Sequence, residues 1–68
     1  MAYYRIYLLN AANRIAGVQE VECESDKNAV EIGALQLASW PSVEIWQYAR
    51  RVAQLLPERA KAAFYAVL

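Results

Sequence analysis

The feature that most constrains the fold is the alternation of apolar and polar residues in separate short segments. From Gln19 to Glu24, carboxylates alternate with Val21 and Cys23, which is the pattern of a strand with one buried face. Residues 43–46 repeat this pattern, and residues 3–9 are rich in the aromatic and β-branched side chains that strands favour. We therefore expect strands at residues 3–9, 14–24 and 43–46.

Turn and helix signals separate these strands. Asn10 and Asn13 favour a turn that makes the first two strands a hairpin, and Gly17 predicts a bulge or bend where the alternation slips. Ser25-Asp26 offers an N-cap for a helix over residues 26–39. Pro41 then ends that helix, because the residue before a proline avoids the helical conformation.

The last part of the chain leaves more than one interpretation open. Residues 50–55 fit either a fourth strand or a helical turn, and Pro57 suits the first position of a terminal helix. A right-handed crossover through the central helix brings the third strand beside the first. The prediction is an α+β fold: residues 1–56 form a ββαββ domain, an antiparallel sheet of order 2-1-3-4 with one helix on one face. Residues 57–68 form a C-terminal helix, packed on the sheet or on a partner chain.

Three sequence segments carry a resemblance to known proteins. YRIYLL at residues 4–9, WPSVEIW at 40–46 and ARRV at 49–52 resemble a group of short, uncharacterised bacterial proteins over residues 3–55. The resemblance implies that residues 50–52 are strand, and it implies no activity. The relatives often carry glycine where this chain has Tyr48, which leaves the tightness of the last hairpin open.

Length and composition together point to a partner. A single domain of 68 residues with one cysteine and no histidine has neither a disulfide nor an obvious metal to support a small core. Yet 59% of its residues are hydrophobic, above the usual share of about 45–50%. We expect a second apolar face that is buried in an interface. No run approaches the ~20 apolar residues of a membrane span and no secretory signal is seen, so we expect a cytoplasmic protein with no membrane contact.

The charges and reactive side chains favour binding over catalysis. The formal net charge of zero argues against a general nucleic-acid or membrane-surface binder. Glu20, Glu22 and Glu24 share one face of a strand, about 7 Å apart, and we interpret them as a solvated edge. Cys23 alternates toward the core as a small apolar residue. We expect no enzyme activity, no cofactor, no metal site and no small-molecule substrate.

Two surfaces remain as candidate contacts. Tyr3, Arg5, Tyr7, Leu9, Trp46 and Tyr48 fall on the sheet face away from the helix, and Ile32 and Leu35 fall on a second apolar flank of the helix. We predict a protein–protein interaction or assembly module, homo-oligomeric or an accessory subunit of a larger complex. The alternative is a single-stranded nucleic-acid binder that stacks bases on the same aromatic side chains, which the nearby glutamates disfavour. The predicted interface is Tyr3, Arg5, Tyr7, Trp46, Tyr48, Arg51, Ile32, Leu35, Phe64, Val67 and Leu68.

Overall fold

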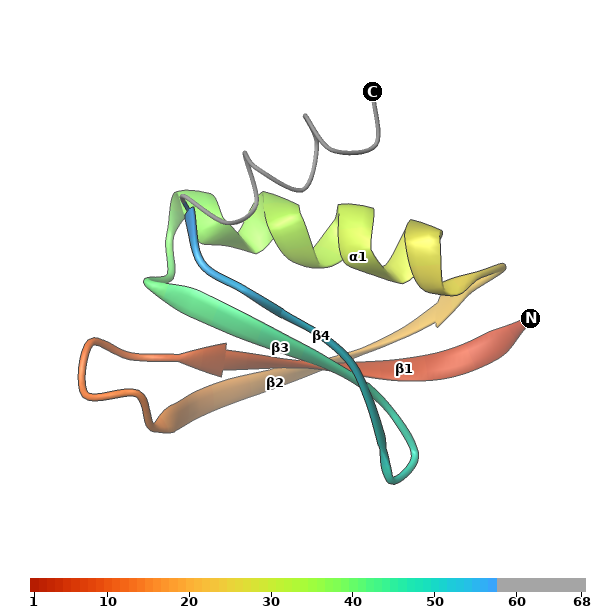
Figure 1. Ribbon diagram of the computed structural model, residues 1–68, viewed down its shortest axis with the longest axis horizontal. Helices are drawn as coiled ribbons and strands as arrows, with labels where there is room; N and C mark the ends of the chain where they lie inside the picture. Colours follow the sequence, from red (N-terminus) through yellow and green to blue (C-terminus); the bar gives the residue numbers. More distant parts are fainter. Residues whose placement is uncertain (58–68) are drawn as a thin grey trace.

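The chain folds as a four-stranded antiparallel sheet with one helix on one of its faces (Figure 1). A computed structural model describes residues 1–57. The sheet order is β2-β1-β3-β4, which confirms the predicted α+β class, ββαββ succession and strand order. The predicted C-terminal helix, beyond Pro57, lies outside the described residues. The elements are β1 (Ala2–Leu9), β2 (Ile15–Cys23), α1 (Asp26–Leu35), a 3₁₀ turn η1 (Gln36–Ala38), β3 (Ser42–Gln47) and β4 (Arg50–Leu55).

The β1–β2 hairpin turns on its asparagines. The Asn10 side-chain oxygen accepts hydrogen bonds from the backbone N–H groups of Ala12 at 2.9 Å and Arg14 at 3.1 Å. Asn13 has a φ of 63°, a left-handed conformation that asparagine tolerates. The pairing shifts between Leu8, opposite Gly17, and Leu9, opposite Ile15. The bulge predicted at the glycine is therefore present, with Ala16 as the extra residue.

The helix begins as predicted and ends earlier. The Ser25 hydroxyl accepts a hydrogen bond from the backbone N–H of Asn28 at 3.2 Å, which is the N-cap geometry. The α-helix stops at Leu35 rather than near residue 39. Its end tightens into η1, where the Gln36 carbonyl accepts from the N–H groups of both Ser39 and Trp40 at 3.0 Å. This tighter winding satisfies carbonyl groups at the helix end before the chain enters β3.

The core lies between α1 and the sheet. Gly33 of α1 brings the helix close to β3, because a Cβ at that position would lie 2.8 Å from Cδ1 of the fully buried Ile45. Ala29, one turn earlier, is also fully buried. Small residues on the inner face of α1 therefore set its distance from the sheet. The remaining buried members of the cluster are Tyr4, Ile6, Leu8, Cys23, Val43 and Leu55.

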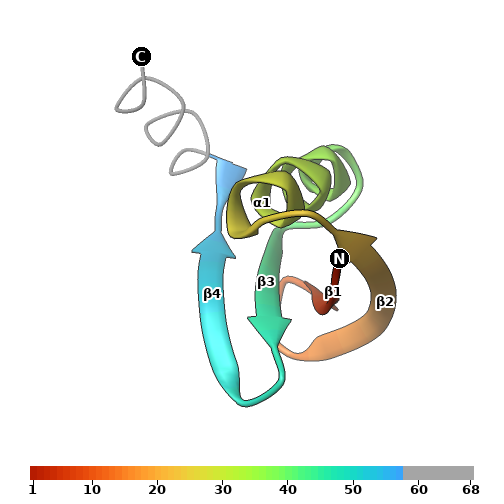
Figure 2. The ribbon, with the colours of Figure 1, turned by 90° about the vertical axis from the view of Figure 1, so that its right-hand side faces the viewer.

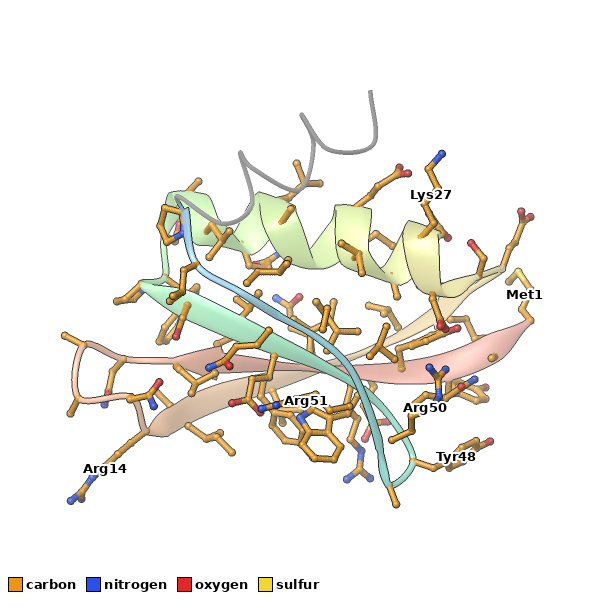
Figure 3. The ribbon with its side chains drawn as sticks, in the orientation of Figure 1. Met1, Arg14, Lys27, Tyr48, Arg50 and Arg51 are labelled. Carbon is orange, nitrogen blue, oxygen red and sulfur yellow. The ribbon has the colours of Figure 1, made fainter. Side chains whose placement is uncertain are left out.

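The outer flank of α1 differs from its prediction. Ile32 is half-buried and packs against the core cluster, so it does not lie on an outward flank with Leu35 as predicted. Its role in a partner contact stays a prediction. The sheet covers a wider arc of the helix than the apolar stripe alone suggested. Leu35 stands 73% exposed on the outward face, together with Glu31 one turn earlier and Lys27 two turns earlier. Lys27 points away from the sheet in Figure 3.

The β3–β4 hairpin is tight. Gln47 pairs with Arg50, which leaves only Tyr48 and Ala49 in the turn, and Tyr48 has a φ of 53°. A register shift between Ile45 and Trp46 makes Val52 the extra residue of a bulge in β4. Residues 50–55 are therefore strand, the alternative that the resemblance favoured. Within residues 1–57, no helix is long and apolar enough to cross a membrane.

Candidate functional site

The sheet face away from α1 collects aromatic and charged side chains from every strand. Among the described residues, α1 and η1 are the only elements outside the sheet, and α1 covers the opposite face (Figure 2). We call this second face the aromatic face. By strand alternation and register it comprises Tyr3, Arg5, Tyr7 and Leu9 of β1, Ile15, Val18, Glu20 and Glu22 of β2, Ser42, Glu44 and Trp46 of β3, and Arg51 and Gln54 of β4.

Four side chains cross the middle of the aromatic face in one row. Arg5 pairs with Glu20 on one side and with Trp46 on the other, and Trp46 pairs with Arg51. The central row therefore runs Glu20, Arg5, Trp46, Arg51, with the carboxylate at the β2 edge and an arginine at the β4 edge. In Figure 3, Arg51 lies on the side of the sheet away from α1.

A neighbouring row is less charged. Tyr7 pairs with Val18 and Glu44, and Glu44 pairs with Gln54, so the second row runs Val18, Tyr7, Glu44, Gln54. The Trp46 indole Nε1–H donates a hydrogen bond to Glu44 Oε1 at 2.9 Å. This bond joins the two rows and fixes the orientation of the indole on the face.

Arg5 is held in place by its neighbours within the same face. Its Nε lies 3.6 Å from Glu20 Oε1, and the two side chains are 61% and 65% exposed. The Tyr7 hydroxyl, and after it the Glu20 carboxylate, raise the pKa of the Arg5 guanidinium above its ordinary value. Such an exposed ion pair contributes little to stability, so these charges are available to a partner.

Much of the exposed apolar surface of the described residues is on or beside this face. Tyr3, Ile15 and Val18 are 60%, 61% and 52% exposed, and Tyr48, on the adjoining turn, is 85% exposed. Leu9, at the end of β1, is only 3% exposed although it lies outside the main core cluster. Exposed apolar side chains gathered on one face are typical of an interaction surface.

A depression lies at one end of the aromatic face, next to the β3–β4 turn. It has a volume of about 370 Å³ and is lined by Tyr3, Tyr4, Arg5, Glu20 and Tyr48. Its wall combines tyrosine rings with one cation and one carboxylate, a surface suited to a side chain of a partner protein. In Figure 3, Tyr48 extends outward from the turn.

A separate polar cluster joins Asp26, at the start of α1, to side chains of β1 and β4. Asp26 Oδ1 accepts from the Tyr4 hydroxyl at 2.7 Å, and Arg50 donates to both Asp26 oxygens at 3.0 and 3.1 Å. Arg50 also donates to the side-chain oxygen of Gln47. The Arg50 guanidinium first, and then the Tyr4 hydroxyl, hold the pKa of Asp26 below its ordinary value. Hydrogen bonding to Asp26, together with burial, raises the pKa of Tyr4.

The structure brings together most of the predicted interface. Tyr3, Arg5, Tyr7, Trp46 and Arg51 share the aromatic face and Tyr48 adjoins it. Leu35 lies on the far side of α1 and is not part of this surface. Phe64, Val67 and Leu68 lie outside the described residues.

Sequence reasoning missed two arrangements. The Asp26 cluster was not foreseen, because several acidic and basic residues could have paired and only the folded chain selects Asp26 with Arg50. The bond between Glu44 and Trp46 had a visible signal, since residues two apart in a strand share a face.

The thiol of Cys23 lies in the core. Cys23 is 1% exposed, and burial raises the pKa of its thiol, as expected of a small core residue. Within the described part of the chain, no group of three or more Cys, Asp or Glu side chains is arranged to hold a metal ion.

A scan of protein-family models, a search of curated proteins and a search of solved structures each gave no match to this chain.

Proposed function

We propose that the chain is a protein-binding module that uses the aromatic face as its contact surface. One observation carries the proposal: all four strands place aromatic, arginine or apolar side chains on the face that α1 does not cover. Tyrosine, tryptophan and arginine are the residues that contribute most to protein interfaces. The Glu44–Trp46 hydrogen bond and the Arg5–Glu20 ion pair already order part of this surface, which lowers the entropy lost on binding.

The charges on the aromatic face favour a protein over a single-stranded nucleic acid. Glu20, Glu22 and Glu44 lie among the aromatic rings, against the cations Arg5 and Arg51. Glu44 binds the indole N–H of Trp46 and Glu20 pairs with Arg5, so phosphate groups would meet carboxylates beside each stacking platform. Nucleic-acid binding depends on a surplus of cations, and this face has none.

Site-specific photo-crosslinking in cells that produce the protein tests the proposal. A photoreactive phenylalanine analogue replaces Tyr7 or Tyr48 in the full chain, and adducts are identified by mass spectrometry. The same analogue at Lys27 or Glu31, on the exposed outer side of α1, is the control. We expect protein adducts of defined mass from the two tyrosine positions and none from the controls.

Two results would count against this function. Adducts that form equally at Lys27 and Tyr7 would mean that the aromatic face is not a preferred contact. Adducts to RNA or DNA alone, abolished by nuclease, would favour the nucleic-acid alternative.

A further inference from the structure

We infer that the partner of the aromatic face is a second copy of the same chain, packed face to face about a two-fold axis parallel to the strands. This inference rests on the proposed function and specifies its partner. The argument comes from the order of charges across the sheet. The carboxylates of Glu20 and Glu22 lie on β2, at one edge of the sheet, and the cation Arg51 lies on β4, at the other edge. The third carboxylate of the face, Glu44, lies between them on β3.

The direction of the two-fold axis decides which strands face each other. An axis parallel to the strands, passing between β1 and β3, places β2 of one copy over β4 of the other. An axis across the strands instead places β2 over β2, so that Glu20 and Glu22 of the two copies approach each other. Like charges opposed in an interface are strongly unfavourable. The parallel axis is therefore the arrangement that the charges permit.

With that axis, the central row is complementary to itself. Its order of Glu20, Arg5, Trp46 and Arg51 is reversed in the second copy. Glu20 then faces Arg51 of the other copy, and Arg5 faces the indole of Trp46. Each dimer thus gains two carboxylate–guanidinium pairs and two cation–π contacts.

The second row fits the same axis. Reversal of Val18, Tyr7, Glu44 and Gln54 places Tyr7 opposite Glu44 of the second copy. The Tyr7 hydroxyl can donate to the carboxylate, whose other hydrogen bond, from Trp46 Nε1, is already made within its own chain. Two sheets packed in this way lie about 10 Å apart with their strands about 30° from parallel, which keeps the facing rows in reach near the axis.

The size of the face predicts a weak dimer. Four strands about 4.8 Å apart give a surface roughly 20 Å wide. A face of this size would bury about 1,000 Å² in total, which is at the lower end of the areas that specific interfaces bury. Interfaces of this size are typically weak and transient. We expect a dissociation constant on the order of 10–100 µM, although the quality of the contacts sets it more than the area does.

Charge reversal at the two edges of the central row tests the inference in the full chain. Glu20→Arg opposes two arginine pairs in its homodimer, and Arg51→Glu opposes two glutamate pairs in its own. Both side chains are exposed, so each variant should fold like the original chain, which circular dichroism checks. We expect each variant alone to dimerise at least about tenfold more weakly. A mixture of the two restores both pairs, and native mass spectrometry should show the mixed dimer in excess.

The control pair reverses charges on the outer face of α1, with Lys27→Glu and Glu31→Arg. These variants should dimerise like the original chain and show no preference for the mixed dimer. Equal amounts of mixed and parental dimers from Glu20→Arg and Arg51→Glu would overturn the inferred axis. An original chain that stays monomeric above the expected range would overturn the second copy as partner. Crosslinks from Tyr7 to a different protein would then retain the proposed function, and a lack of any crosslinks would remove both.

Discussion

Tyr48 is the residue whose backbone departs most from what its side chain favours. It has a φ of 53°, a region that residues other than glycine and asparagine rarely adopt. The turn demands it, because Gln47 pairs directly with Arg50 and leaves two residues to reverse the chain. Its ring is 85% exposed, so packing does not compensate for the strain. A strained, exposed tyrosine beside the depression is consistent with a role in contact.

Tyr48→Gly should stabilise the fold. Relief of the left-handed strain outweighs the entropy that glycine adds to the unfolded chain, for a net gain of about 0.5–1 kcal/mol in the free energy of unfolding. Urea titration at a fixed, low chain concentration measures the change. Ala49→Gly is the matched control, since Ala49 has no positive φ, and it should lower stability. A loss of stability in Tyr48→Gly would show that the tyrosine side chain stabilises the turn.

At the scale of elements, the Asp26 cluster ties the start of α1 to β1 and to the β3–β4 hairpin. One carboxylate accepts from Tyr4 and from both terminal nitrogens of Arg50. Arg50 immediately follows the Tyr48–Ala49 turn. The cluster therefore also fixes where the hairpin, and with it Tyr48, sits relative to the helix.

Asp26→Asn should flatten the dependence of stability on pH. The pKa of Asp26 is lowered in the fold, so its contribution is complete above the unfolded value of about 3.9 and is lost as pH falls through the folded pKa. The pKa of Tyr4 is raised, so its contribution is complete below about 10 and is lost as pH rises through the folded value. Thermal unfolding across pH should show both losses reduced in Asp26→Asn.

Glu24→Gln is the control for this experiment, because it removes an exposed carboxylate only two residues away. It should leave the pH profile nearly unchanged. A profile of Asp26→Asn that matches the original chain at low pH would mean that other carboxylates govern acid unfolding.

The elements that sequence predicts are those with a local signal. Alternation located the three strands at residues 3–9, 14–24 and 43–46 to within about two residues of β1, β2 and β3, and the Ser25 cap located the start of α1. The end of α1 was misplaced, because the helix tightens into a 3₁₀ turn at Gln36 where the chain leads into β3, and no residue pattern marks that change. Ile32 was misassigned because the arc of a helix that a sheet covers depends on how the two pack.

The candidate site was predictable as a face but not as a set of contacts. Period-two alternation placed Tyr3, Arg5 and Tyr7 together, and the correct strand order added Trp46. Which residues stand opposite each other depends on the bulges at Ala16 and Val52. The bulge in β4 in particular aligns Arg51 with Trp46, and nothing in the sequence fixes its position.

On the scale of the whole molecule, the core lies on one side of the sheet and the proposed contact on the other. The helix-facing side is fully buried at Ile6, Val43 and Ile45. The aromatic face is half-buried or exposed except at its Leu9–Ser42 end, where both residues are buried. In a chain of 68 residues, a core on one side of the sheet supplies only a few kcal/mol of stability. Association through the second face would add the support that the composition led us to expect.

The melting temperature should therefore rise with chain concentration. A partner that binds only the folded chain stabilises it by mass action, and calorimetry over a concentration series measures this directly. The slope should fall at high salt, because the paired charges at the edges of the face are screened. Arg51→Glu should show almost no slope. An identical slope in that variant would contradict a dimer built on the central row.

The one-sided core has a consequence for how such a chain can diverge. Residues that hold the fold and residues of the proposed contact occupy opposite surfaces of a single sheet, so a change in one set should leave the other largely intact. After gene duplication, two copies could exchange a few charges on the outer surface and cease to recognise each other, while both continue to fold. Selection could then produce separate pairing specificities on an unchanged scaffold.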